Sequence, residues 1–299
     1  MRRFLVLALA APLLVVVPAA AAVIDRVRIA EAGGAVTRSF PPSVFVSVTS
    51  PADYVRASSS SSGGRWLGPR YQATGNGSLG GETSIAWHLR FTSGQKDAEA
   101  AAETVAHRGW PVDIKGGVSV PHVVAGRTVG TILGHYVLRR APGAKSAAFD
   151  AAFAFPVASR LYALLRFELL EPATDDAGDQ GRYVVKGSLP ASIWNRGQAF
   201  WALTAVRLEG NLAPTRVAAR VAPNGQAVRG TVADAFRHPI IGARVVLERE
   251  TGAGWTRVAS ARTNSRGAYS VRGISRPGRY RAVAAVGRAV ARSASFFAG

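Results

Sequence analysis

Histidine can bind metals and transfer protons near neutral pH, and this sequence has five: His88, His107, His122, His135 and His238. None of them stands at the spacing of a histidine metal motif such as H-E-x-x-H. His122 and His135 flank a predicted hairpin and could approach each other as a metal-binding pair. Because no third ligand is near them in the sequence, we interpret them as ordinary surface or half-buried histidines, and we expect no metal site and no cofactor.

Acidic side chains concentrate in one stretch, ELLEPATDDAGDQG. Asp175, Asp176 and Asp179 in this glycine-containing stretch could supply some of the oxygen ligands that calcium needs. Their spacing does not match the D-x-D-x-D-G pattern, so a solvated loop is the preferred interpretation. Glu168 and Glu171 could act as a glycosidase pair only at a particular separation, which nothing in the sequence supports.

A serine nucleophile on a G-x-S-x-G elbow is not found. The nearest stretch, GVSVP, lacks the second glycine, so we interpret Ser119 as a strand or loop residue. The sequence contains no cysteine, which excludes disulfides, thiolate catalysis and cysteine zinc sites within it. We therefore expect a protein that is not an enzyme and that binds or scaffolds instead.

Two alternative functions stay open. One is a secreted hydrolase whose site is assembled within residues 40–210 from positions too scattered for a motif. Its candidate positions are Asp113, His122, His135 and the segment around Asp175. The other is a carrier of a small apolar ligand, which would need an unfilled cavity beneath Trp194 and Trp201. Large aromatic residues more commonly fill a core, so plain packing is the preferred interpretation of these tryptophans.

The N-terminal residues have the features of a secretory signal peptide. Arg2 and Arg3 precede an apolar run from Phe4 to Val17, and Ala20 and Ala22 stand at an A-x-A spacing. The run is shorter than the roughly 20 residues that cross a bilayer, so we expect cleavage and no transmembrane segment afterwards. We predict a secreted or extracytoplasmic protein that associates with the cell envelope.

The chain is strongly basic, with 37 Lys and Arg against 18 Asp and Glu and a formal net charge of +19. A surface of this sign attracts polyanions whether or not it has a specific site. Because we expect export, the predicted partners are anionic cell-envelope polymers or another secreted protein, and nucleic acid is not expected. The oligomeric state is left open. The abundance of Arg, Ala and Gly also resembles the composition of secreted proteins from actinobacteria, which have GC-rich genomes.

Residues 40–210 combine strand and helix patterns. Strands are predicted at 44–48, 83–92, 122–140 (as a hairpin around Gly126), 147–157 and 159–172. A helix is predicted within residues 93–110, with Ser93 or Asp97 as its N-cap, His107 and Arg108 near its C-terminal end, Gly109 as its C-cap and an alanine face that should pack on a sheet. A second helix over 190–208 should place Trp194 and Trp201 against the sheet. We predict an α+β fold, an antiparallel sheet with packed helices. In its order of elements and its final aromatic helix this region resembles the PsbP-like fold.

The remaining chain has short strand-like runs at regular spacing between turn residues, which is typical of a β-sandwich. Four segments in order, GTVAD (230–234), HPIIGARVVL (238–247), TNSRGAYSV (263–271) and PGRYRAV (277–283), resemble the carboxypeptidase regulatory-like domain family. The resemblance implies a transthyretin-like, all-β Greek-key sandwich that carries no catalytic residue. The predicted organisation is a signal peptide at 1–22, a lead-in at 23–39, the α+β domain at 40–210, a linker at 211–226 and the sandwich at 227–299.

The stretch NSRGAYSV predicts a hairpin turn that leads to a core aromatic residue. Asn264 begins the turn, Gly267 can take a positive φ, and Tyr269 should point into the core.

Four arginines form a candidate polyanion-binding face, because they alternate with positions expected to be buried. These residues are Arg244, Arg272, Arg279 and Arg281. A solvated strand exterior is the preferred interpretation, since charged residues normally occupy such positions.

Overall fold

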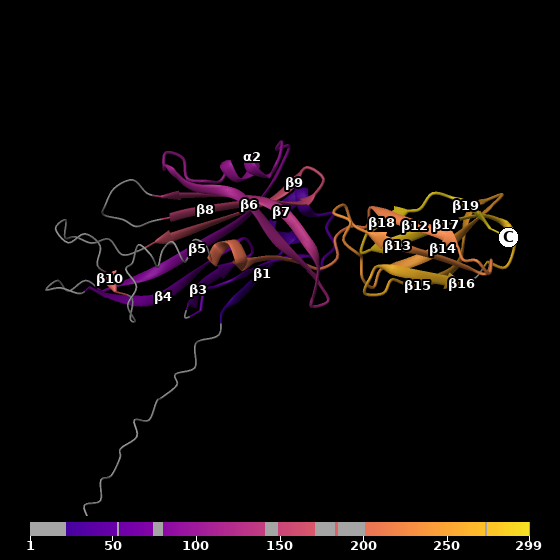
Figure 1. Cartoon of the computed structure of the whole chain (residues 1–299), viewed down its shortest axis with the longest axis horizontal. Coiled ribbons are helices and arrows are strands. Elements are labelled where there is room, and N and C mark those ends of the chain that lie inside the picture. The colour runs from indigo at the N-terminus through magenta and orange to yellow at the C-terminus, as the bar shows by residue number, and fades with distance from the viewer. Residues whose placement is uncertain are drawn as a thin grey trace, which may run out of the picture.

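The structure is a computed structural model that describes residues 22–52, 54–73, 80–140, 149–170, 183–184, 201–272 and 274–298. It is elongated, with a large curved sheet at one end and a smaller β-sandwich at the other (Figure 1). Nearly all of the predicted signal peptide lies outside the described residues. No helix among the described residues has the length and apolar character needed to span a membrane.

The large sheet is antiparallel except for one parallel pair, β11 with β6. Its strands, in spatial order, are β1 (Ile24–Arg28), β2 (Phe45–Thr49), β11 (Val206–Glu209), β6 (Val112–Val124), β7 (Arg127–Arg140), β8 (Phe149–Ala158), β9 (Leu161–Leu170), β5 (Gly80–Ser93), β4 (Gly63–Ala73) and β10 (Tyr183–Val184), while β3 (Val55–Ser60) pairs with β4. The hairpin predicted around Gly126 is confirmed, because the β6–β7 turn consists of Ala125 and Gly126, both with positive φ.

The sheet curves until its two ends meet through Asp25 of β1. Trp66 of β4 donates its indole N–H to Asp25 Oδ2 at 2.8 Å, and Arg56 of β3 forms an ion pair with the same carboxylate. An aromatic core lies inside the curve, where Trp201 packs edge-on against Trp66 and Phe167 at centroid distances of 5.9 and 5.7 Å. Because the sheet covers its own apolar face, little core surface is left for helices to cover.

The predicted α+β fold is therefore wrong. The α-helices α1 (Ile29–Ala32) and α2 (Ala98–Glu103) and the 3-10 helix η1 (Gly34–Thr37) are short and form no layer. In the segment predicted as a helix over 190–208, residues 201–205 are helical and residues 206–209 form strand β11. Val206 and Leu208 are buried and alternate with exposed Arg207, so the period of two overrides the helical pattern here. Trp194 lies outside the described residues.

The predicted alanine-faced helix is present as α2 but ends at Glu103 instead of Arg108. Asp97 caps it, since its Oδ1 accepts the Ala100 N–H at 2.9 Å. Ala101 and Ala102 are fully buried against β7, β8 and β9, as the sequence predicted. Small side chains let this short helix lie close to the outside of the large sheet.

Residues 216–298 form two smaller sheets, which together we call the sandwich. One sheet has the order β12 (Arg216–Val221), β13 (Ala227–Ala233) and β16 (Ala268–Arg272); the other has β15 (Gly254–Arg262), β14 (Arg244–Thr251), β17 (Gly278–Val286) and β18 (Ala289–Arg292), with β19 (Phe296–Ala298) also on β17. A second apolar core fills the space between them. The segment predicted as a linker over 211–226 contains β12, so part of it belongs to the sandwich.

The turn predicted at Asn264 is confirmed, with Gly267 at φ +69°. Asn264 Oδ1 accepts the backbone N–H groups of Arg266 and Ala268 at 2.9 and 3.0 Å, which organises the turn locally. The turn does not close a hairpin, however, because β15 and β16 belong to different sheets. It carries the chain from one sheet to the other.

Tyr269 enters the core as expected, and its place there depends on a glycine opposite. Its hydroxyl donates to the Ala218 carbonyl at 2.7 Å, and burial raises the pKa of the phenol. Gly230 is the register partner of Tyr269 on β13. A Cβ on Gly230 would lie 1.8 Å from the Ala218 oxygen and 2.7 Å from the Tyr269 hydroxyl oxygen. A side chain at residue 230 would therefore push β12 and the Tyr269 ring away from β13.

We predict that Gly230→Ala lowers the free energy of unfolding of the sandwich by about 1–3 kcal/mol, the usual cost of overpacking a core. Urea denaturation followed by tryptophan fluorescence and circular dichroism measures this. Gly252→Ala is the matched control, because a Cβ there would meet nothing within 4 Å. Equal stability of the two variants would contradict the packing described for Tyr269.

Candidate metal centre

His122 occupies an inward position of β6 where the strand pattern expects an apolar residue. Val118, Val120, His122 and Val124 alternate with more exposed positions, and the His122 side chain has no exposed surface. Its register partner on β7 is Gly130. A Cβ on Gly130 would lie 2.3 Å from ring atoms of His238, so the missing side chain makes room for a histidine that belongs to the sandwich.

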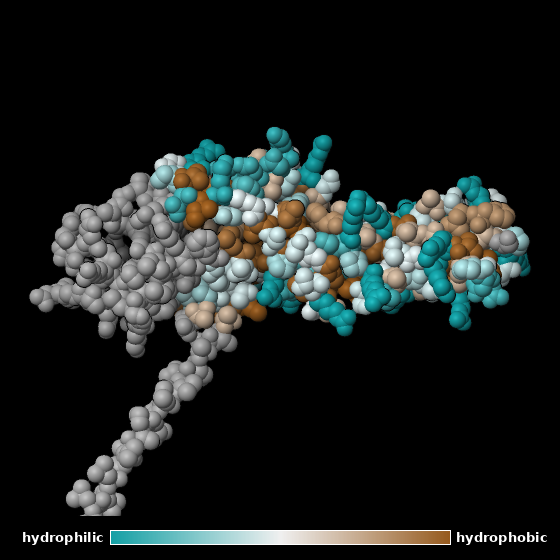
Figure 2. Space-filling view, viewed as in Figure 1, coloured by the Kyte–Doolittle hydropathy of each residue, from teal (hydrophilic) through white to brown (hydrophobic). Residues whose placement is uncertain are grey.

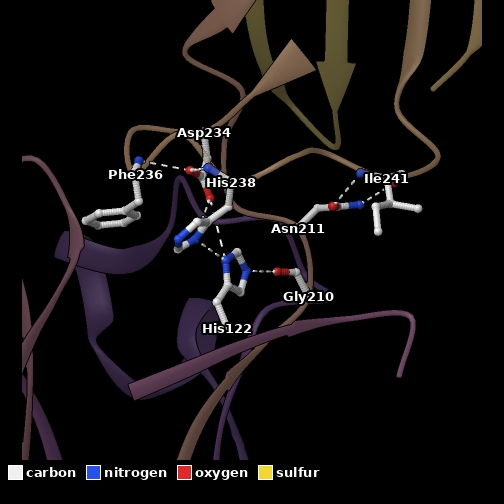
Figure 3. Close-up of polar contacts among 7 residues, drawn as sticks. All are labelled: His122, Gly210, Asn211, Asp234, Phe236, His238 and Ile241. Atoms are coloured by element: carbon white, nitrogen blue, oxygen red, sulfur yellow. Dashed lines mark hydrogen bonds and ion pairs between the residues drawn. The ribbon is translucent and has the colours of Figure 1, made fainter. Parts of the chain in front are cut away.

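Asp234 and His238 are positioned by a compact turn that follows β13. Asp234 Oδ1 accepts the backbone N–H groups of Phe236 and His238, both at 2.9 Å, and Asp234 N–H donates to the His238 carbonyl at 3.0 Å. Arg237 completes the turn at φ +68°. These local bonds use one carboxylate oxygen and leave the other, Oδ2, directed toward the two histidines (Figure 3).

The three side chains converge from both parts of the molecule (Figure 3). His122 Nδ1 lies 2.9 Å from His238 Nδ1, and these nitrogens lie 3.7 and 3.9 Å from Asp234 Oδ2. Asp234 and His122 are fully buried, and the His238 side chain is 11% exposed. A buried carboxylate is thus enclosed by two imidazole nitrogens.

The hydrogen-bond partners determine where the protons lie. His122 Nε2 is 2.8 Å from the Gly210 carbonyl, which can only accept, so Nε2 carries the proton. Burial lowers the pKa of His122 below its ordinary value, which favours the neutral ring with a lone pair on Nδ1. Asp234 Oδ2 is shielded from solvent and has no hydrogen bond. A buried carboxylate oxygen without a partner is costly, and a bound cation would satisfy it.

The donor set fits a zinc ion. Tetrahedral Zn²⁺ with bonds of about 2.0–2.1 Å separates its ligand atoms by about 3.3–3.4 Å. The three separations of 2.9, 3.7 and 3.9 Å lie on both sides of that value, so small movements would complete the geometry. The bond from His122 to the Gly210 carbonyl is the outer contact that usually orients a metal-binding imidazole.

Other contacts hold the junction beside this cluster. The Asn211 side chain accepts the Ile241 N–H at 2.9 Å and donates to the Ile241 carbonyl at 2.6 Å, which joins the end of the large sheet to the sandwich. Phe236, in the turn between Asp234 and His238, packs against the core of the large sheet. The two parts therefore meet through ordered polar and apolar contacts.

The histidine pair considered in the sequence is not brought together. His122 lies opposite Gly130, whereas His135 lies opposite Gly117, five positions away along β6. His122 instead meets His238, 116 residues later in the chain. The feature of the sequence that could have indicated this site was the four-residue spacing of Asp234 and His238. These two residues lie in a turn, so their spacing matches no helical metal motif.

Other residues considered in the sequence are scattered. Asp113 and Ser119 are exposed on β6, and Glu168 forms an ion pair with Arg166 at 3.0 Å. Glu171 and the aspartates at 175, 176 and 179 lie outside the described residues.

The four candidate arginines lie on both sheets of the sandwich. Arg244, Arg279 and Arg281 are on the five-stranded sheet, and Arg272 is on the three-stranded one. Arg281 binds Glu248 at 2.8 Å and lies over the Trp255 ring at 4.2 Å. Arg279 approaches Glu250 at 3.5 Å. On the face that Figure 2 shows, hydrophilic side chains project from both parts of the molecule.

No protein-family model matches the chain, and the comparisons with curated proteins and with solved structures found no match. The resemblances to the carboxypeptidase regulatory-like and PsbP-like families therefore stay predictions. His122, Asp234 and His238 lie where the two parts of the molecule meet, and we call them the junction cluster.

We predict that Gly130→Ala displaces the His238 ring from the cluster and destabilises the junction by about 1–3 kcal/mol, because the new methyl group overlaps that ring. Histidine ring NMR resonances and thermal unfolding measure the two effects. Gly117→Ala, on the paired strand, is the control, since its Cβ would meet nothing closer than 4.0 Å. Unchanged His122 and His238 resonances in the Gly130 variant would contradict the described cluster.

Proposed function

We propose that this chain is an extracytoplasmic, non-enzymatic binding protein whose two parts are joined by a zinc ion. His122, Asp234 and His238 supply the protein ligands. The observation that carries the proposal is the Asp234 Oδ2 atom, which is buried without a hydrogen bond and faces two imidazole nitrogens. Each part contributes ligands, so the ion would hold the sandwich against the large sheet.

Burial supports a structural ion over a catalytic one. A catalytic zinc keeps a coordination position that substrate or water can reach. Here two ligand side chains are fully buried and the third is 11% exposed. Three protein ligands leave the fourth position of a tetrahedral ion to a small molecule such as water, as in catalytic zinc sites, so the structural assignment depends on the burial that keeps this position away from bulk solvent.

Export and association with the cell envelope are further parts of this proposal. They are supported by the signal-peptide features of the first residues and by the net charge of +19. A centre of imidazole and carboxylate ligands suits an oxidising compartment, because it contains no thiolate that could be oxidised.

Metal binding is the direct test of the proposal. The full chain is treated with EDTA, dialysed and titrated with Zn²⁺ against a chromophoric chelator, and bound metal is counted by mass spectrometry. We expect one tightly bound zinc ion per chain and at least a tenfold loss of affinity in His122→Ala and His238→Ala. His88→Ala is the control, because His88 is exposed on β5, which is separated from β6 in the sheet by β7, β8 and β9. Equal zinc binding by the His122 and His88 variants would overturn the proposal.

Stability gives a second, independent prediction through Asp234→Asn. Without metal, the variant should be at least as stable as the native chain, because it removes a buried charge whose Oδ2 atom has no hydrogen bond. With zinc at about 100 times its Kd, the native chain should gain about 2.7 kcal/mol and the variant much less. Thermal unfolding with EDTA and with zinc measures both differences. The same zinc-dependent gain in both proteins would contradict the role of Asp234.

A further inference from the structure

A basic pocket lies on the outside of the large sheet, beside α2. Its volume is about 290 Å³, and its walls come from β5, from β9 and from the segment that follows α2. His88 and Arg90 of β5 and Arg166 of β9 line it, together with His107 and Arg108. None of the proposed zinc ligands belongs to its lining.

Two of the three arginines that line this pocket have no acidic partner among the described residues. Arg90 and Arg108 are exposed and form no ion pair with any residue that the structure describes. The third arginine of the pocket, Arg166, forms ion pairs with Asp150 and Glu168. An anion entering between Arg90 and Arg108 would therefore meet unpaired positive charge from β5 and from the segment after α2.

The pocket is held in shape by a buried carboxylate beneath it. Asp150 is fully buried, and its two oxygens accept hydrogen bonds from Arg166 Nε and from the His107 backbone N–H, both at 2.5 Å. Asp150 thus ties β9 to the segment after α2. Arg166 Nη2 is used by neither of its acidic partners. The positions of two pocket walls are determined before any ligand arrives.

His107 lines the pocket with a ring that is held against Trp110. Its ring stacks on Trp110 at a centroid distance of 4.2 Å, which limits the positions that the ring can take. The His107 Nδ1 atom is shielded from solvent and has no hydrogen-bond partner. Shielded polar atoms without a partner are uncommon.

We propose that this pocket binds a phosphate group. A planar carboxylate is satisfied by one arginine in a two-pronged pair, whereas a tetrahedral phosphate can accept from several donors in different directions. The donors here come from β5, β9 and the segment after α2, which suits the second geometry. The group could belong to free phosphate or to the phosphodiester repeat of an anionic polymer.

Calorimetric titration of the full chain at about 0.15 M salt and at higher salt tests the proposal. The probes are inorganic phosphate, a synthetic glycerol phosphate polymer and polyglutamate of similar length. We expect the polymer to bind, phosphate to compete with it and polyglutamate to bind at least tenfold more weakly. Stronger binding per phosphate to the polymer identifies the phosphodiester source, and equal binding identifies free phosphate.

A charge-matched pair of variants separates a site from general attraction. Arg90→Gln with Arg108→Gln should lower phosphate affinity at least tenfold. The control, Arg216→Gln with Arg288→Gln, removes the same charge from exposed positions of the sandwich and should change affinity less than twofold. Equal losses in the two double variants, or no phosphate binding to the native chain, would overturn the proposal.

The zinc proposal and this one can fail separately. Asp234→Asn should leave phosphate binding unchanged, because Asp234 does not line the pocket. Phosphate binding that requires zinc would instead overturn the assignment to this pocket. Circular dichroism of each double variant verifies that the large sheet is intact.

Discussion

The junction of this molecule is organised around a carboxylate that is buried without a hydrogen bond on one of its oxygens. Water cannot solvate Asp234, so its charge has to be balanced by groups that the fold places around it. The turn after β13 satisfies Oδ1 with backbone N–H groups, and His122 and His238 enclose Oδ2. The absence of a side chain at Gly130 and the carbonyl of Gly210 complete this arrangement.

The curvature of the large sheet explains both the fold and the location of its polar groups. Asp25 joins strands from opposite ends of the sheet, so the aromatic core is enclosed by strands, and the helices stay short. Its two polar clusters then lie at the end of the sheet and on its outside. The junction cluster occupies the end, and the basic pocket occupies the outside beside α2.

Two buried carboxylates act in different ways. Asp150 has hydrogen bonds on both oxygens and positions a basic wall, so its own charge is satisfied by the protein. Asp234 has partners on one oxygen alone, which leaves coordination capacity for a cation. The same side chain is therefore fully hydrogen-bonded by the protein in one place and keeps an oxygen without a hydrogen bond in the other.

Several local features follow from the sequence by itself: the cap at Asp97, the hairpin at Gly126 and the turn at Asn264 all depend on neighbours within a few residues. The basic character of the chain is likewise a property of composition. The fold class was decided by strand pairing across the chain, which overrode a helical pattern near residue 206. The meeting of His122 with His238 was decided only by tertiary structure, because it depends on strand register and on how the sandwich contacts the large sheet, and no local spacing contains that information.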